Sequence, residues 1–378
     1  MEYAIRAMVS KVALVLRTAF PVIGLLCFTS PLFAQSLPPQ LATPKQIRDM
    51  LVQRVDVQHK ATGIVVGLIS KRGREIISYG KFDANDPRVP DGETIFEIGS
   101  ITKVFTALLL SDMALRGEVN LKDSVSKYLP SSVHMPTRNG KQITLLDLAT
   151  HYSGLPPEPA HSNQSYTVEQ MYDFLDHYQL TRDPGTKYEY SNFGMGLLGQ
   201  VLARRAGTDY ESLLRTRITA PLHMDHTALH LTADMQAHLT PGHSGRNIAP
   251  PIPIHALAAA GAIRSNVDDM LIFLAANMGL IRTPLQPAMK QMLKVRRFDS
   301  PGLDTGLGWH IVDGGYGTVF HNGKTFGYHA FIAFEPQRKV GVIILSNGAE
   351  EIGDIAWQVL YHPVEAPTEW HVGPEGVY

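Results

Sequence analysis

A serine and a lysine three positions apart, Ser100 and Lys103 in the stretch GSITKVF, could together form a nucleophile. Residues i and i+3 of a helix share one face, so the lysine amine would lie beside the serine hydroxyl. A neighbouring amine favours the alkoxide form of a hydroxyl and so activates a weak nucleophile. If the helix begins at Ser100, the positive end of its dipole adds to this effect.

The same spacing recurs at Ser124 and Lys127, so the pattern alone does not identify a site. The ordinary interpretation of such a pair is a serine that caps a helix, with a solvated lysine one turn later. The stretch after Ser100 predicts a long buried helix, because Val104 and Leu108 recur at helical spacing. No such apolar run follows Ser124, so we favour Ser100 as the nucleophile.

The stretch YEYSNFG supplies a candidate base, Tyr190, and a candidate substrate-binding residue, Asn192. A tyrosine held near two cations can lose its proton below its usual pKa of about 10 and act as a base. The side-chain amide of Asn192 offers a donor and an acceptor to a substrate amide. The alternative is a loop tyrosine followed by a helix N-cap, a position that suits Ser191 or Asn192.

A third candidate segment is His321-Asn322-Gly323, which leads into the tripeptide GKT. GKT ends a phosphate-binding loop only when a glycine stands at position 318 and a helix follows. Thr318 stands there, and the following residues are typical of a strand, which excludes a nucleotide site. Gly323 would instead allow a substrate to approach the strand closely. His321 would point into the cleft as a donor or cation, the alternative being a strand histidine with a satisfied partner.

The elements that must position these residues are strands at both ends of the chain. Apolar runs at 63–70 and 75–80 predict a hairpin, and four runs between 308 and 347 predict an antiparallel meander with short turns. The stretch between them predicts mostly helices, and a helix at 265–279 begins with Ser265.

This order predicts an α+β fold, in which an antiparallel sheet from N- and C-terminal strands is flanked by helices and carries a mostly helical inserted domain. We expect residues 41–104 and 251–363 to form the sheet domain. Residues 105–250 would form the helical domain, and residues 364–378 a C-terminal tail.

The order of the three segments resembles that of the penicillin-recognising serine hydrolases, which include class C β-lactamases, D-Ala-D-Ala carboxypeptidases and related esterases. The resemblance extends over nearly the whole mature chain. Five further stretches resemble the same family: ITLLDLATHYSGLP (143–156), YSNFGMGLLGQVLARRAG (190–207), APLHMDHTAL (220–229), AAAGAIRSNVDDM (258–270) and GLGW (306–309).

The resemblance implies a β-lactamase/transpeptidase-like fold and a role for each candidate. Ser100 would be acylated, and Lys103 and Tyr190 would share the proton transfers. Asn192 would bind the side-chain amide of the substrate. The backbone N–H groups of Ser100 and Lys324 would form the oxyanion hole.

The third motif departs from the family, because His321-Asn322-Gly323 stands where Lys-Thr-Gly is usual. A lysine there gives a permanent charge for the substrate carboxylate, whereas a histidine is charged only when protonated, with a reference pKa of ~6.5. Activity should therefore rise below about pH 7 if protonated His321 assists. Asn347 resembles a family position that helps to hold the carboxylate, and a turn asparagine is the alternative.

The N-terminus predicts a cleaved export signal at residues 1–34, with an uncleaved anchor as the alternative. Basic residues precede an apolar core at 19–28 that is too short to span a bilayer, and Ala34 offers a cleavage position. The only cysteine, Cys27, lies in this segment, so the mature chain would form no disulfide.

The rest of the composition narrows the choice of partners. A net charge of −1 without basic runs disfavours nucleic acid and anionic membranes. We expect no cofactor and no metal, because the 16 histidines show no zinc-binding spacing. The sequence thus predicts an exported, periplasmic or secreted bacterial serine hydrolase for β-lactams or D-Ala-D-Ala-type peptides from peptidoglycan. A carboxylesterase and a penicillin-binding sensor without turnover are the alternatives.

Overall fold

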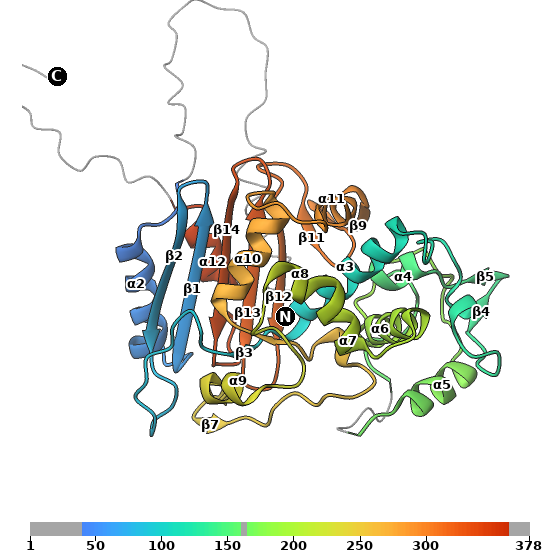
Figure 1. Cartoon of the computed structure of the whole chain (residues 1–378), viewed down its shortest axis with the longest axis horizontal. Helices are drawn as coiled ribbons and strands as arrows, with labels where there is room; N and C mark the ends of the chain where they lie inside the picture. The colour runs from blue at the N-terminus through green and yellow to red at the C-terminus, as the bar shows by residue number, and fades with distance from the viewer. Residues whose placement is uncertain (1–39, 160–164, 363–378) are drawn as a thin grey trace, which may run out of the picture.

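The structure is a computed structural model that describes residues 40–159 and 165–362. Its largest element is an eight-stranded antiparallel sheet in the order β2-β1-β14-β13-β12-β11-β10-β9 (Figure 1). The strands are β1 (Gly63–Ser70), β2 (Gly73–Gly80), β9 (Arg297–Ser300), β10 (Leu303–Thr305), β11 (His310–Val312), β12 (Val319–Lys324), β13 (His329–Glu335) and β14 (Val340–Ser346). The sheet therefore joins strands from both ends of the chain, which confirms the predicted α+β arrangement.

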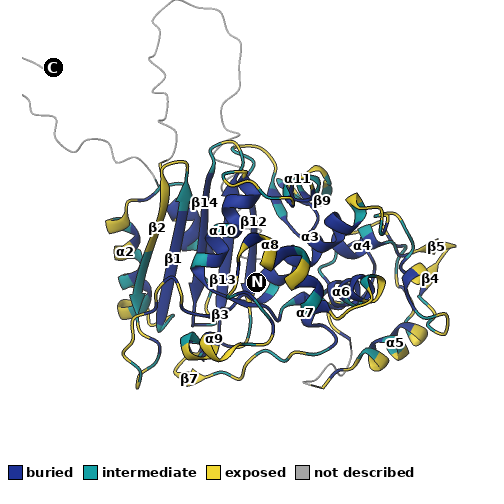
Figure 2. Cartoon of the chain, viewed as in Figure 1, coloured by how far each residue is buried: buried dark blue, intermediate teal, exposed yellow. Residues whose placement is uncertain are grey.

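The central strands of the sheet are buried on both faces, because alternate side chains enter two different cores, whereas the edge strand β2 is exposed or half-buried (Figure 2). In β1, for example, Ile64 lies in one core and Val65 in the other. Helices α2 (Pro44–Val52) and α12 (Gly353–Leu360) cover the first face, and α10 (Val267–Met278) covers the second. The central strands β1 and β14 are consequently continuous apolar runs rather than alternating patterns.

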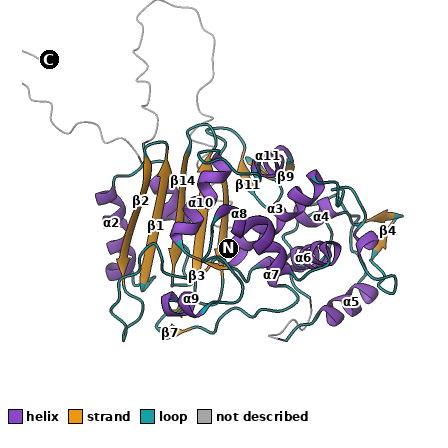
Figure 3. Cartoon of the chain, viewed as in Figure 1, coloured by secondary structure: helices purple, strands orange, loops and turns teal. Residues whose placement is uncertain are grey.

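The helices beside the sheet surround α3 (Thr102–Leu115), as Figure 3 shows. This helix is buried on nearly all sides, as expected for a helix that is apolar all round. It packs against α6 (Asn192–Ala206) and α11 (Gln286–Lys294). The remaining α-helices and short strands are α4 (Leu145–Ala149), α5 (Val168–His177), α7 (Tyr210–Leu214), α8 (Ala220–Leu222), α9 (Ala233–His238), β3 (Phe96–Glu97), β4 (Thr137–Arg138), β5 (Lys141–Gln142), β6 (His243–Ser244), β7 (Asn247–Ile248) and β8 (Arg264–Ser265).

Two local details differ from the sequence-based expectations. The N-cap of α10 is Asn266 rather than Ser265, because the Asn266 side chain accepts the Asp269 N–H at 2.8 Å while Ser265 ends β8. The strands β9 and β10 were not expected, since 297–305 is polar and lies at the edge of the sheet.

The predicted signal segment 1–34, with Cys27, and the predicted tail 364–378 lie outside the described residues. Among the residues that the structure does describe, no helix combines the length and apolar character needed to cross a bilayer. The domain boundaries at 104 and 251 stay a prediction.

Candidate active site

The catalytic pair predicted from the sequence lies at the start of α3. Ser100 belongs to a short 3₁₀ helix, Gly99–Ile101, that leads directly into α3, and Lys103 lies one turn later. The Lys103 Nζ atom is 2.8 Å from Ser100 Oγ and donates to the Ala260 carbonyl at 2.6 Å. Lys103 is fully buried, whereas Ser100 is half-buried and lines a cavity.

Burial lowers the pKa of Lys103 from 10.5 to about 7, because the ammonium form loses its hydration. The Glu158 carboxylate acts in the opposite direction and raises this pKa. Near neutral pH a large share of Lys103 is therefore the neutral amine. With one N–H directed to Ala260, the amine can turn its lone pair to the Ser100 hydroxyl and accept its proton.

Tyr190 lies beside this pair and is held by His151. The Lys103 Nζ is 4.8 Å from the centre of the Tyr190 ring, and the His151 ring stacks on the same phenol at 4.5 Å. His151 also accepts the N–H of Glu189 at its carbonyl and that of Ser191 at Nδ1. The backbone is thus fixed on both sides of Tyr190. Burial lowers the pKa of His151 well below 6.5, so the ring is neutral.

The third segment approaches the nucleophile through glycine backbones. A Cβ atom on Gly323 would lie 1.9 Å from the Ile98 carbonyl oxygen and 3.1 Å from the Ser100 nitrogen. Gly99, at φ +51°, lies so close to β12 that a Cβ there would be 2.6 Å from the Lys324 nitrogen. Glycine is required at both positions, because any side chain would separate β12 from the turn that carries Ser100.

The Lys324 N–H points away from β13. Thr325 donates its N–H to the Tyr328 carbonyl across that hairpin, and N–H directions alternate along an antiparallel strand. On the other edge of β12, β11 pairs with Val319 and Phe320 only. Lys324 therefore lies past the paired part of that edge, where its N–H can meet a ligand close to the Ser100 nitrogen.

A cavity of about 420 Å³ opens above Ser100. Asn192 and Lys324 line it, as do Glu158 and His255, which were not predicted from the sequence. The remaining lining residues are Ile252, Pro253, Leu257, Ala258, Ala260, Gly261, Ala262 and Phe326. Asn192 donates from Nδ2 to Glu158 Oε1 at 2.5 Å, and its neighbour Ser191 caps α6. The site thus combines an apolar wall, two side-chain charges and the serine hydroxyl.

His321 does not line this cavity, which corrects the expectation that it points into the cleft as a cation. The residue is 2% exposed, and its Nδ1 is 2.6 Å from the Asn322 carbonyl oxygen. Its ring faces that of His310 at 5.1 Å. Burial, followed by the charges of His310 and Lys103, lowers the pKa of His321 well below 6.5. A neutral imidazole cannot supply the charge of the lysine that is usual here.

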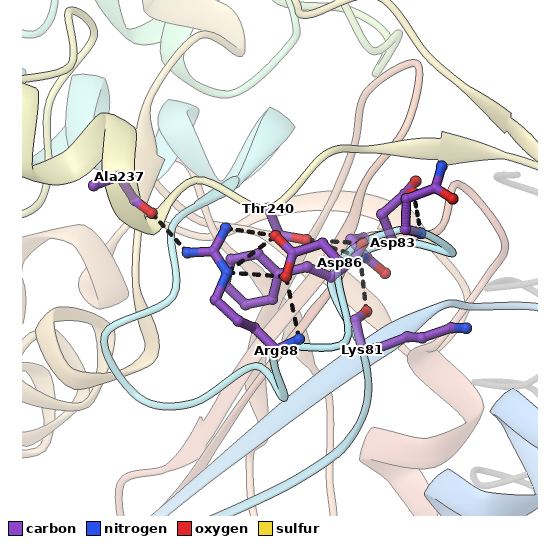
Figure 4. Close-up of polar contacts among 9 residues, drawn as sticks. Lys81, Asp83, Asp86, Arg88, Ala237 and Thr240 are labelled. Atoms are coloured by element: carbon purple, nitrogen blue, oxygen red, sulfur yellow. Dashed lines mark hydrogen bonds and ion pairs between the residues drawn. The ribbon is translucent and has the colours of Figure 1, made fainter.

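Asn347 is also buried away from the cavity, so the turn-asparagine alternative describes it better than carboxylate binding. Its Oδ1 accepts the Gly63 N–H at 2.6 Å, and its Nδ2 donates to the Phe82 carbonyl at 2.8 Å and to Thr240 Oγ1 at 2.9 Å. Figure 4 shows that loop, in which Arg88 bonds to Asp86 and to the Ala237 carbonyl. The Asn347 amide is fully used in joining β1 to this loop.

The second Ser-x-x-Lys pair forms no site. Lys127 lies in a 3₁₀ helix (Val125–Tyr128), and its ammonium pairs with Asp123 at 2.9 Å rather than with Ser124. Ser124 Oγ bonds to Ser126. The solvated-lysine interpretation is therefore right for this pair.

Comparison with known proteins identifies the family. The family model for Beta-lactamase matches residues 47–359, which is most of the chain. The chain belongs to the β-lactamase family. It is therefore a hydrolase of the β-lactamase and carboxypeptidase type.

Three relatives illustrate this membership. The D-alanyl-D-alanine-carboxypeptidase/endopeptidase AmpH of Escherichia coli K12 is 30% identical over 75% of this chain and 79% of its own. A β-lactamase of the same organism is 25% identical over 84% of this chain and 94% of its own. The solved structure of a β-lactamase/D-alanine carboxypeptidase from Yersinia pestis aligns with a TM-score of 0.72 and 27% identity, covering 84% of this chain and 97% of that one. These alignments confirm the predicted β-lactamase/transpeptidase-like fold.

Proposed function

We propose that this β-lactamase-family protein is a serine hydrolase that forms an acyl-enzyme at Ser100 and acts on β-lactams or D-Ala-D-Ala-type peptides. The observation that carries the proposal is the buried Lys103 amine, 2.8 Å from a serine hydroxyl that lines the cavity. The names of the relatives, which include a β-lactamase and a D-Ala-D-Ala carboxypeptidase, support the choice of substrates.

In the acylation step, the neutral Lys103 amine accepts the Ser100 proton while Oγ attacks the carbonyl carbon. The carbonyl oxygen becomes an oxyanion, which the N–H groups of Ser100 and Lys324 stabilise. Loss of one such donor typically lowers kcat by about 10²–10³. Both donors belong to the backbone, so they need no reorganisation during the reaction.

The tetrahedral intermediate then collapses, and its carbon–nitrogen bond breaks. Tyr190 donates its proton to the leaving nitrogen. Tyr190 then takes a proton from the protonated Lys103. An ester of Ser100 remains. In deacylation a water molecule loses a proton to the same groups and attacks the ester carbon. Those groups then return the proton to Ser100 Oγ as the carboxylic acid leaves. Lys103 and Tyr190 thus move the same proton in both directions.

Export to the periplasm or the surroundings of the cell is part of the proposal. The basic residues and apolar core within 1–34 support it. The expected sizes of the intact and mature chains differ by that segment, so mass spectrometry of protein purified from the periplasm would test it.

The function is tested with a chromogenic cephalosporin, a D-Ala-D-Ala peptide and a short nitrophenyl ester. We expect turnover that Ser100→Ala abolishes and that the matched variant Ser124→Ala leaves unchanged, since Ser124 lies in the second Ser-x-x-Lys pair. An acyl adduct should map to the peptide that contains Ser100. Turnover of the ester alone would favour the carboxylesterase, and a stable adduct without turnover would favour the sensor. Full activity of Ser100→Ala would refute the mechanism.

A further inference from the structure

Glu158 gives the cavity a negative charge on the side of Asn192. The carboxylate lines the cavity, is exposed there, and accepts the Asn192 Nδ2 at 2.5 Å. Because a carboxylate only accepts hydrogen bonds, this contact also fixes which way the Asn192 amide is turned. One Asn192 N–H is thereby used, and the carboxylate together with the Asn192 carbonyl oxygen makes this wall rich in acceptors.

The segment that carries Glu158 is held firmly against the start of α6. Ser191 Oγ donates to the Pro156 carbonyl at 2.6 Å, and the Asn192 N–H donates to the Pro157 carbonyl at 2.9 Å. Prolines stand on both sides of Glu158, at 157 and 159, and each fixes a backbone φ angle. The backbone on the N-terminal side of Glu158 is therefore tied to the start of α6, and the carboxylate itself contacts Asn192.

The Glu158 carboxylate contacts the neutral Asn192 amide rather than a cation. Lys103 is directed to Ser100 and Ala260, and with its pKa lowered to about 7 it is neutral in about half of the molecules at pH 7. Lys324 also lines the cavity and is exposed, and its charge acts on the buried His329 and on Glu351 as well. His255 is half-buried, and burial lowers its pKa below 6.5, so it adds no charge.

We propose that Glu158 is a specificity-determining residue that selects substrates with an ammonium group on the acyl side. In the proposed acyl-enzyme the acyl carbon is bonded to Ser100 Oγ, and Asn192, which lines the same cavity, is expected to contact the acyl substituent. An amine on that substituent would meet the Glu158 carboxylate. This inference rests on the proposed acyl-enzyme function and names its preferred substrate class, acyl groups with a free amine.

The test compares matched substrates that differ only in this amine. Ampicillin is benzylpenicillin with an added α-amino group. D-alanyl p-nitroanilide carries a free ammonium where its N-acetyl form carries a neutral amide. We expect kcat/KM to be about five- to tenfold higher for the amine in each pair, as for one partly exposed charge-assisted contact. Glu158→Gln should bring the ratio close to one, whereas Glu75→Gln, an exposed carboxylate on β2, should leave it unchanged.

Using a ratio removes the effect of Glu158 on Lys103, since that effect is common to both substrates of a pair. Added salt should lower the ratio in wild type and not in Glu158→Gln. An equal ratio in wild type, or a preference that survives Glu158→Gln, would overturn the proposal.

A binding experiment tests the role of Glu158 independently of the proposed acyl-enzyme mechanism. The Ser100→Ala variant cannot be acylated, so its affinity for each compound can be measured by calorimetry. Preference for the amine form there, lost on adding Glu158→Gln, would support the subsite even if turnover fails. Equal affinities for the amine and acetyl forms would refute it even if Ser100 proves to be the nucleophile.

Discussion

The pH dependence of turnover tests the most specific chemical statement made above, that Lys103 acts as a neutral amine. A lysine with its usual pKa of about 10.5 is neutral in roughly one molecule in 3,000 at pH 7. With the pKa lowered to about 7, half of the molecules carry the neutral amine. Burial thus makes the base about 10³ times more available at neutral pH.

The shape of the profile follows from this pKa. The neutral fraction rises from about 3% at pH 5.5 to about 97% at pH 8.5, so kcat/KM should rise about 30-fold and level off above pH 8. A base with an unshifted pKa would give a rise of about 10³ over the same range without a plateau. Since the Glu158 carboxylate raises the Lys103 pKa, Glu158→Gln should move the rising limb to lower pH.

The assay measures kcat/KM for hydrolysis of an uncharged nitrophenyl ester at constant buffer concentration and ionic strength. Rates are corrected for spontaneous hydrolysis. Lys103→Arg serves as the control, because a guanidinium keeps its proton throughout this range. We expect this variant to lose activity at every pH. A flat wild-type profile, a log-linear rise without a plateau, or an unchanged profile in Lys103→Arg would each refute the assignment of Lys103 as the base. A profile that rises towards acid pH would instead restore the charged His321 that the structure argues against.

Three further outcomes are expected from the same geometry. Gly323→Ala places a Cβ atom 1.9 Å from the Ile98 carbonyl oxygen, so it should cost about 1–3 kcal/mol in urea unfolding and lower kcat by about 10²–10³ as β12 moves from the oxyanion hole. Lys103→Met removes a buried amine and should raise the free energy of unfolding at pH 6 by about 1–4 kcal/mol while abolishing turnover. Unfolding in guanidinium chloride measures the change in stability. Burial lowers the pKa values of His151, His321 and His329 in the folded chain, so below pH 6.5 the unfolded chain binds protons that the folded chain does not. The free energy of unfolding should therefore be highest above pH 6.5 and fall below it by about 1.4 kcal/mol per pH unit for each of these histidines. Urea unfolding at pH 6.5 and 5.5 checks this.

The sequence predicted the parts of the molecule that depend on neighbours along the chain. The i to i+3 spacing of Ser100 and Lys103 leads directly to their contact, because both lie on one turn of helix. The sheet was predictable because its strands are long apolar runs joined by short turns, which allow only antiparallel neighbours. The edge strand β9 escaped notice because a polar, partly exposed strand has no apolar period to reveal it, and its neighbour β10 is only three residues long.

Orientation was the part that the sequence could not supply. His321 and Asn347 both stand at strand positions that the family resemblance connects with substrate, but their surroundings come from distant segments. The Asn347 side chain is used by Gly63, 284 positions away in sequence, and by the loop at Phe82. His321 is buried against His310, which belongs to the next strand of the sheet. Residue type and motif order say nothing about such partners.

Glu158 shows a different limit. No periodic pattern or motif points to a carboxylate between two prolines. The structure connects Glu158 with the site through its contact with Asn192 and through the Pro156 and Pro157 carbonyls, which accept hydrogen bonds from the start of α6. His151 is similar, since its contacts to Glu189 and Ser191 fix Tyr190 from a segment some forty residues earlier. Rigid supports of this kind are visible only once two loops are placed together.

One feature of the site could nevertheless have been inferred from the sequence. The helix that follows Ser100 is apolar on every side, so a lysine in its first turn must be buried whichever way the helix is rotated. A buried lysine without a close carboxylate must have a lowered pKa, because only the neutral amine tolerates the loss of water. The chemistry proposed at Ser100 thus depends on the helix that carries Lys103: the apolar residues that make α3 a core element also lower the pKa of Lys103 to about 7, which the proposed role as a base requires.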